Sequence, residues 1–398
     1  YRRDVRVINT ALFATDWYID DMKKKAFDSD PIPSQLTHDH YKYGSRDYII
    51  FNEIDTDSIN INIWMDWVAS DDPRTMYQIP SSGQVVNTFP TKSFRLPVNK
   101  QAVLESGVVS LKDQAKIVPY IDVTIKDEVI YKNRLLMLDI IANNNWERPI
   151  YFSGGSFGDD DYLWMKDYLQ MDGVVYKLVP IKTPVDKENP FDMGRVDADK
   201  SYNIVKNWDW GNSGDPTIYH DIETRRNGLT YRSNLARIAE ALLKEDKLDK
   251  AREILDLAME KMPVDIFAFY SLLEPYMQMY YRVNQPEKAR EIYEQLAVVY
   301  QEKLLYFSSF KTKEQIDMRR EIYTDMERYR AVVTVLLAED TKEYALSQAI
   351  KFNDYIKLFP YLYNPDEGIE LENMPDSGPD TETPSQSSLQ ELLQSQDN

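Results

Sequence analysis

The stretch from Leu135 to Gly155 constrains the fold most, because it contains a helix, a helix stop, a strand and a glycine loop in succession. Three asparagines, 143–145, end the helix, since asparagine tolerates the left-handed conformation common at helix C-termini. Pro149 can only open a strand or lie at its edge, and the apolar run 150–153 follows it up to two glycines. The helix itself is predicted by apolar residues at helical spacing, Leu135, Leu138, Ile141 and Ala142. This order of elements predicts an α/β fold for the first half of the chain.

Other short strands and helices are expected around this stretch. Strands are predicted at 5–9, 48–51, 94–98, 120–125 and 174–180, and helices at 16–27, 57–69, from 127 into the asparagines, and at 162–169. Short apolar strands that alternate with helices are typical of parallel sheets. We therefore predict an α/β domain over 1–181, with a mostly parallel sheet flanked by helices.

The second half changes to long helical patterns, and five residues repeat within it. Lys250–Ile254 reads Lys-Ala-Arg-Glu-Ile, and the same five residues recur at 288–292, 38 positions later. Small alanines let paired helices approach closely, as tetratricopeptide repeats require. We predict tetratricopeptide-like helical hairpins over 222–361, with a kink at Pro275 in the second unit and a third, degenerate hairpin over 312–360. Residues 182–221 are predicted as a linker or crossing loop, and 362–398 as a disordered tail rich in Ser, Gln, Asp and Pro.

The charge and cysteine content exclude several classes of protein. The net charge of −19 disfavours duplex nucleic acid as a partner, because such binding depends on cationic contacts to phosphate. The chain has no cysteine, which removes disulfides and thiolate metal sites and fits an oxidising compartment such as the periplasm. No apolar run approaches the roughly 20 residues of a membrane span. Because Tyr1 opens the chain without Met or an apolar signal region, we expect a soluble fragment of a longer protein.

The glycine loop after residue 153 is the first candidate binding site. Strand C-termini are where α/β sheets bind ligands, so Gly154, Gly155 and Asp159 could form such a site. The dinucleotide fingerprint fails at Ser153, however, and the aspartates 159–161 would repel a phosphate. Helix capping by aspartate explains the pattern better than a phosphate or Ca²⁺ site.

The histidines and carboxylates do not define catalytic chemistry. The three histidines are His38, His40 and His220, and the first two lie in a Pro-rich loop around Asp39. Such unspecific spacing does not predict a metal site. No Ser-His-Asp or Cys-His arrangement is evident, so we expect no catalytic residue, no metal and no cofactor in this chain.

Two further groups could bind a ligand or lie at a domain junction. Trp208 and Trp210, in a polar loop, could stack on a sugar ring, although tryptophans more often fix a loop to a core. Arg225 and Arg226 could grip a carboxylate or phosphate, although such arginines more often pair with acidic residues where domains meet.

Several segments together resemble one family. They are Asp4–Thr10 with Thr15–Ile19, the string Ala142–Phe152, Trp210–Asn212, Tyr219–Asp221 and Thr224–Arg226 before the helical repeats. The chain is similar, over about residues 1–360, to the soluble C-terminal region of a bacterial domain-of-unknown-function family. These large multi-span membrane proteins are related to protein O-mannosyltransferases. The spans of that family, with the acidic residues expected to transfer the sugar, are absent from this sequence.

The resemblance implies a non-catalytic, extracytoplasmic region of a membrane glycosyltransferase-like protein on the periplasmic side of a bacterial inner membrane. It would recognise or position an acceptor protein on the repeat surface, or scaffold partners, beside its own membrane domain. Asn144, Trp146 and Arg148, in the most specific string, would then lie at a binding site or a domain junction. The alternative is that the α/β domain itself is an enzymatic or sugar-binding unit that uses the Gly154/Asp159 loop.

Overall fold

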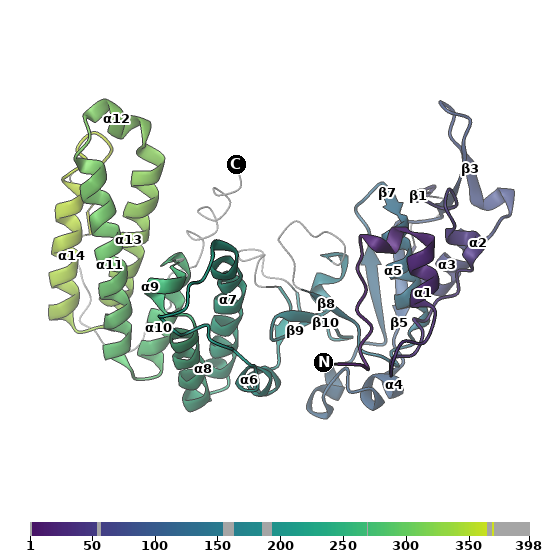
Figure 1. Cartoon of the computed structure of the whole chain (residues 1–398), viewed down its shortest axis with the longest axis horizontal. Coiled ribbons are helices and arrows are strands. Elements are labelled where there is room, and N and C mark those ends of the chain that lie inside the picture. Colours follow the sequence, from purple (N-terminus) through teal and green to yellow (C-terminus); the bar gives the residue numbers. More distant parts are fainter. Residues whose placement is uncertain are drawn as a thin grey trace. The chain divides into compact units, whose positions relative to one another are not determined.

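The structure is a computed structural model of the whole chain, and it describes residues 2–53, 57–153, 163–184, 193–268, 270–363 and 368–369. The chain divides into two compact units (Figure 1). Unit 1 comprises residues 1–170, 175–186 and 193–195, and unit 2 comprises 171–174, 187–192 and 196–398. The fold class is that expected from the sequence, an α/β region followed by a helical region.

The described strands form small sheets rather than one large one. One sheet has the strand order β3-β4-β1-β7, formed by Met76–Gln78, Val85–Phe89, Tyr48–Phe51 and Val129–Tyr131. A second has the order β2-β5-β6, formed by Ile59–Asn60, Ser93–Pro97 and Tyr120–Thr124. A third has the order β11-β9-β10-β8, formed by Arg195–Val196, Leu169–Asp172, Val175–Leu178 and Tyr151–Ser153.

The prediction of a mostly parallel arrangement is wrong in this detail, because the sheets are mixed. Strand β1 pairs in parallel with β4, and β2 with β5. The pairs β1–β7, β3–β4, β5–β6 and β8–β10 are antiparallel. Strands β3 and β4 are joined by a short turn with Gly83 at φ 71°, and such a connection permits only an antiparallel hairpin.

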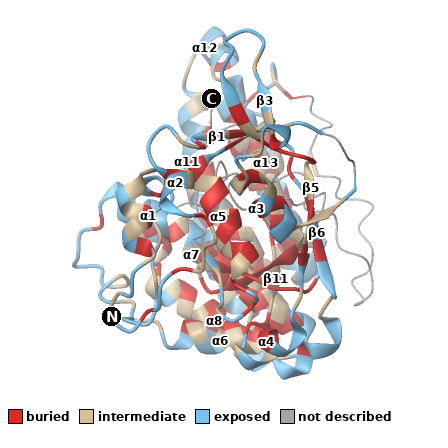
Figure 2. Ribbon diagram, turned by 90° about the vertical axis from the view of Figure 1, so that its right-hand side faces the viewer, coloured by how far each residue is buried: buried red, intermediate tan, exposed pale blue. Residues whose placement is uncertain are grey.

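Helices cover these sheets in unit 1. The α-helices are α1 (Asp16–Met22), α2 (His38–Tyr41), α3 (Ile61–Ala69), α4 (Lys100–Glu105) and α5 (Lys132–Asn143). Short 3₁₀ turns are η1 (Leu12–Ala14), η2 (Pro73–Thr75), η3 (Leu111–Lys116) and η4 (Leu163–Tyr168). The Trp64 ring of α3 stacks on Phe89 of β4 with the ring centroids 3.7 Å apart, and its indole N–H donates to the carbonyl of Thr91. Helix α5 is buried along much of its length (Figure 2).

The expected strand at 5–9 is absent. This segment has no strand partner among the described residues, and Val7 is 79% exposed. At its end, the N–H of Asn9 donates to the hydroxyl of Tyr18, and the carbonyl of Asn9 accepts the N–H of Phe13. Alternation of apolar residues therefore did not suffice to form a strand here.

Unit 2 is built mainly from helices. They are α6 (Ala198–Lys206), α7 (Ile222–Lys244), α8 (Leu248–Lys261), α9 (Val264–Phe267), the 3₁₀ turn η5 (Tyr270–Leu272), α10 (Glu274–Arg282), α11 (Pro286–Ser308), α12 (Thr312–Asp317), α13 (Arg319–Glu339) and α14 (Lys342–Ile356). Helices α7 and α8, α10 and α11, and α13 and α14 pack as hairpins. Figure 1 shows α11, α13 and α14 side by side.

The five-residue repeat has the same structural role in both copies. Ala251 of α8 and Ala289 of α11 are both fully buried. The repeated lysines both form ion pairs, Lys250 with Asp199 at 2.7 Å and Lys288 with Asp256 at 2.6 Å. The repeat thus marks the second helix of two successive hairpins.

Two expectations for the helical half differ from the structure. Pro275 does not kink a helix but lies in the first turn of α10, where a missing N–H costs nothing. The residues before it form α9 and η5 instead of a longer helix. Part of the expected linker is also ordered, since α6 begins after Asp197, whose carboxylate accepts the N–H of Lys200 as an N-cap.

Candidate functional site

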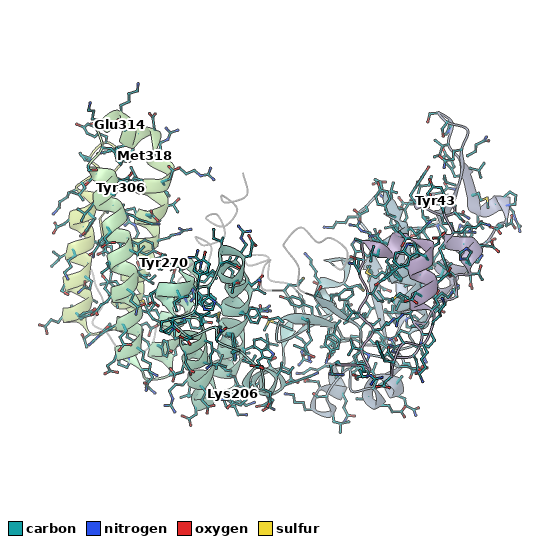
Figure 3. The ribbon with its side chains drawn as sticks, in the orientation of Figure 1. Tyr43, Lys206, Tyr270, Tyr306, Glu314 and Met318 are labelled. Atoms are coloured by element: carbon teal, nitrogen blue, oxygen red, sulfur yellow. The ribbon has the colours of Figure 1, made fainter. Side chains whose placement is uncertain are left out.

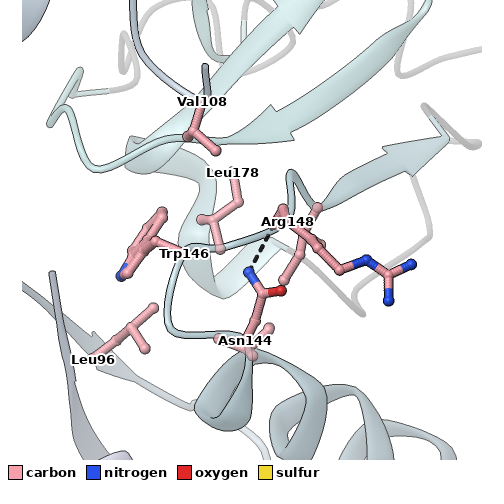
Figure 4. Close-up of a pocket in the computed structure, with 8 residues that line it drawn as sticks. Leu96, Val108, Asn144, Trp146, Arg148 and Leu178 are labelled. Carbon is pink, nitrogen blue, oxygen red and sulfur yellow. Dashed lines mark hydrogen bonds between the residues drawn. The ribbon is translucent and has the colours of Figure 1, made fainter. Parts of the chain in front are cut away.

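The asparagine turn is held by hydrogen bonds to its own backbone. Helix α5 ends at Asn143, as predicted, and Asn145 and Trp146 then adopt positive φ angles of 45° and 63°. The Asn144 side chain donates to the carbonyl of Arg148 over 2.7 Å, which closes the turn (Figure 4). A left-handed conformation is unfavourable for an aromatic residue, so tertiary packing must hold Trp146 in it.

Trp146 supplies that packing. Its side chain is 5% exposed, and its indole N–H donates to the carbonyl of Pro97 at the end of β5 over 2.8 Å. The hydroxyl of Ser106 donates to the Trp146 carbonyl. A void of about 10 Å³ lies beside this ring, lined by Leu96, Val108, Ile141, Asn144, Trp146, Arg148, Ile150 and Leu178 (Figure 4). A void of this size has room for about one water molecule and none for an organic ligand.

Arg148 has different partners from those expected of a domain-junction arginine. The guanidinium donates to the carbonyl oxygens of Asp30 and Pro31 and to the Ser29 hydroxyl, at 3.0 to 3.2 Å. These are loop backbone and hydroxyl groups rather than carboxylates. Arg148 therefore anchors the loop 29–31 onto the asparagine turn.

A buried carboxylate that the sequence did not single out holds the next part of this loop. Asp139 of α5 is fully buried, and it accepts hydrogen bonds from the Ser34 hydroxyl and the Gln35 N–H. Burial raises the pKa of Asp139. A carboxyl group enclosed in this way has a structural role. Its only sign in the sequence is an acidic residue on the apolar face of the helix.

The other candidates in the α/β half have structural roles or lie outside the described residues. Gly154, Gly155 and Asp159 belong to the range 154–162, which the structure does not describe. His38 pairs with Asp20 at 3.0 Å, and His40 accepts the N–H of Thr37 at the start of α2. Within the part of the chain that is described, no group of His, Asp and Glu has the arrangement of a metal site.

The tryptophans of the loop after α6 pack against α7 within unit 2. Trp208 and Trp210 both lie against Tyr231 of α7, with centroid separations of 5.5 and 5.7 Å. Gly173 is required beside them, because a Cβ there would lie 2.7 Å from the Trp208 ring. This arrangement favours loop anchoring over an open stacking platform.

Arg225 and Arg226 face different surroundings at the start of α7. Arg226 pairs with Glu223 one turn earlier, and both side chains are largely exposed. The Nε of Arg225 is buried without a hydrogen-bond partner in the described structure, as is the Nε2 of His220. Neither arginine grips a described carboxylate from another element.

Unit 2 contains a large open groove that the sequence did not identify. It measures about 1080 Å³ and lies between α8 and α11, with α9, η5 and Tyr280 of α10 completing its walls. Its lining residues are Asp256, Met259, Glu260, Pro263, Val264, Asp265, Tyr270, Tyr280, Lys288, Glu291, Ile292, Glu294, Gln295, Val298 and Val299. We call this surface the α8–α11 groove. It is large enough to take several side chains of a partner.

Comparison with known families assigns the first half of the chain. A family model described as TMEM260-associated domain 2 matches residues 1–200. The chain belongs to this family. The matched range of TMEM260-associated domain 2 contains the asparagine turn and ends within α6.

No curated protein and no solved structure matches the chain. None of the helices formed by the described residues combines the length and apolar character that a membrane crossing requires.

Proposed function

We propose that this chain is a non-catalytic, extracytoplasmic region of a membrane glycosyltransferase-like protein, and that its helical unit recognises or positions an acceptor polypeptide. The observation that carries the proposal is the α8–α11 groove, which offers about 1080 Å³ of open, partly apolar space. The family description, which names a domain associated with TMEM260, supports a connection with a membrane protein.

The architecture of unit 2 supports a binding role. Tetratricopeptide-like hairpins stack into an extended surface on which a polypeptide can lie. In this proposal the asparagine turn of the α/β unit has a structural role. Sugar transfer would be performed by the membrane part that the resemblance implies. A periplasmic location next to that membrane domain belongs to the same proposal.

The rival proposal is a sugar- or nucleotide-sugar-binding α/β unit built on the Gly154/Asp159 loop. Isothermal titration of the whole chain separates the two. We expect heat of binding with unstructured Ser/Thr-containing peptides and none with nucleotide sugars or free glycans. Binding of nucleotide sugars without binding of any peptide would replace our proposal with the rival one.

A pair of matched variants locates the peptide. Val298, 52% exposed, lines the groove on α11, whereas Ile350, 51% exposed, lies on α14 and does not line it. Val298→Gln should weaken peptide binding several-fold without lowering the melting temperature, and Ile350→Gln should leave affinity unchanged. Equal effects of the two changes would place the peptide elsewhere.

A further inference from the structure

The α8–α11 groove is strongly acidic. Its lining contains the carboxylates Asp256, Glu260, Asp265, Glu291 and Glu294, and Lys288 is the cation among the lining residues. That cation is already neutralised, since Lys288 Nζ lies 2.6 Å from Asp256 and 5.7 Å from the centre of the Tyr280 ring. Lys288 therefore adds no free positive charge to the groove.

Several of these carboxylates lack a cationic partner in the described structure. Glu291 and Asp265 form no ion pair with a described residue, and Glu294 accepts only a long hydrogen bond, 3.4 Å, from the Tyr344 hydroxyl. Glu260 pairs with Lys261 at 2.6 Å. Like charges gathered in a concave surface raise the local negative potential and attract cations. The groove thus presents uncompensated negative charge to whatever enters it.

Apolar groups lie between the carboxylates and continue along α11. Met259, Pro263, Val264 and Ile292 line the groove, and Val298 follows on the exposed side of α11. Leu305, 51% exposed, occurs two helical turns after Val298 on the same face, and Tyr306, 61% exposed, lies beside it. Gln301 and Glu302 occupy that face between them. Figure 3 shows Tyr306 near the end of unit 2 where α11, α12 and α13 meet. From Val298 to Tyr306 these exposed apolar side chains are spread over about 12 Å of the helix.

We infer that the α8–α11 groove binds a basic segment of a partner polypeptide, in which Lys or Arg residues alternate with apolar ones. The basic side chains would face Glu291, Glu294 and Asp265, and the apolar ones would contact Val264 and Val298, with Leu305 further along α11. This inference rests on the proposed function and adds the chemistry of the segment. A second copy of this chain is a poor occupant, because each copy carries a net charge of −19.

Three peptides of equal length test the inference with the whole chain. They share the same leucines and carry Lys, Gln or Glu at every other position. We expect the Lys peptide to bind at least ten-fold more tightly than the Gln peptide and the Glu peptide not to bind. The affinity for the Lys peptide should fall as salt rises from about 50 to 300 mM, since salt screens exposed charges.

Charge reversal then tests the location. The double change Glu291→Lys with Glu294→Lys should reduce affinity for the Lys peptide at least ten-fold. The matched control reverses two exposed glutamates of α13 outside the groove lining, Glu321→Lys with Glu339→Lys, and should change affinity less than two-fold. Circular dichroism of both variants confirms that unit 2 stays folded.

The outcomes separate this inference from the proposed function. Equal binding of the Lys and Gln peptides, independent of salt, would overturn the basic preference and leave polypeptide recognition in place. An equal loss from both charge reversals would overturn the groove as the binding location. Absence of binding by all three peptides, together with absence of binding by Ser/Thr-containing peptides, would overturn both.

Discussion

The guanidinium of Arg232 donates a hydrogen bond to the carbonyl oxygen of Ala268, 36 residues further along the chain, over 2.6 Å. A second donation, 2.7 Å, goes to the carbonyl of Met262 at the end of α8. Ala268 has a positive φ of 52°, so its carbonyl cannot join a helix, and Arg232 satisfies it instead. Arg232 is 1% exposed, and burial lowers its pKa. One buried cation thus fixes the segment that forms the end wall of the α8–α11 groove.

Arg232→Leu should therefore destabilise unit 2. The change leaves the buried carbonyl of Met262 and the partly buried carbonyl of Ala268 without this donor, and a buried unsatisfied group costs about 1–3 kcal/mol. We expect a loss of about 2–4 kcal/mol in the free energy of unfolding, measured by denaturant titration. Arg226→Leu on the same helix removes an exposed ion pair and should cost less than about 1 kcal/mol. Equal stability of the two variants would contradict this role for Arg232.

Trp146→Ala should also destabilise the chain, by about 3–5 kcal/mol, because it removes a buried ring and the donor to Pro97. Trp17→Ala is the control: the same residue type is removed where the side chain is 60% exposed. Differential scanning calorimetry should show a lower unfolding temperature for Trp146→Ala only. If Trp146→Ala had the same melting temperature as the parent protein, the asparagine turn would not depend on this ring.

Overpacking tests the close helix contact at the repeat. Ala251 is fully buried on α8, so Ala251→Leu should cost about 1–3 kcal/mol. Ala338→Leu makes the same change at an exposed position near the end of α13 and should have an effect below about 0.5 kcal/mol. Urea unfolding midpoints compare the two. A midpoint for Ala251→Leu that matches the control would remove the evidence for tight packing between α7 and α8.

Glu274 predicts a pH-dependent stability. Burial raises the pKa of its carboxyl above the ordinary value of 4.5, and no hydrogen bond to it is found in the described structure. A raised pKa in the folded state means that the native protein binds the proton more tightly, so stability falls as pH rises from 4.5 through the folded pKa. Glu274→Gln should therefore raise the melting temperature at about pH 8 and change it little at about pH 4.

The control for this effect is Glu287→Gln, at an exposed position in the first turn of α11, just as Glu274 lies in the first turn of α10. The two changes remove the same charge from the first turn of a helix, so dipole effects are similar in the comparison. If the gain in melting temperature were the same at both pH values, or equal for both variants, burial of the Glu274 carboxylate would carry no cost in stability.

Local periodicity identified several elements correctly. The strand at 48–51 matches β1, and 120–125 contains β6, because alternating apolar residues face the core there. The long helices of unit 2 and the buried alanines of the repeat followed from helical spacing. These features depend on residues close in sequence, and pattern analysis registers them directly.

Features that arise from distant residues were not predictable. Arg148 bonds to carbonyls of Asp30 and Pro31, about 120 residues earlier, and a backbone acceptor leaves no trace in the side-chain pattern. The α8–α11 groove depends on how α9 and η5 separate two helices that have the same five-residue repeat. The glutamates that line it look like ordinary exposed helix positions until their neighbours are known.

The turn between β9 and β10 has a consequence for the modularity of the protein. Residues 171–174 belong to unit 2, where the Asn234 side chain of α7 donates to the carbonyl of Gly173 and the Ser201 hydroxyl of α6 donates to that of Met171. The chain therefore enters unit 2, returns to unit 1 and enters again before α6. A polypeptide cut before α7 would lose part of the unit it was meant to isolate. Recombination that exchanges the helical half between related proteins would have to carry this turn with it, so the two halves are expected to be inherited together.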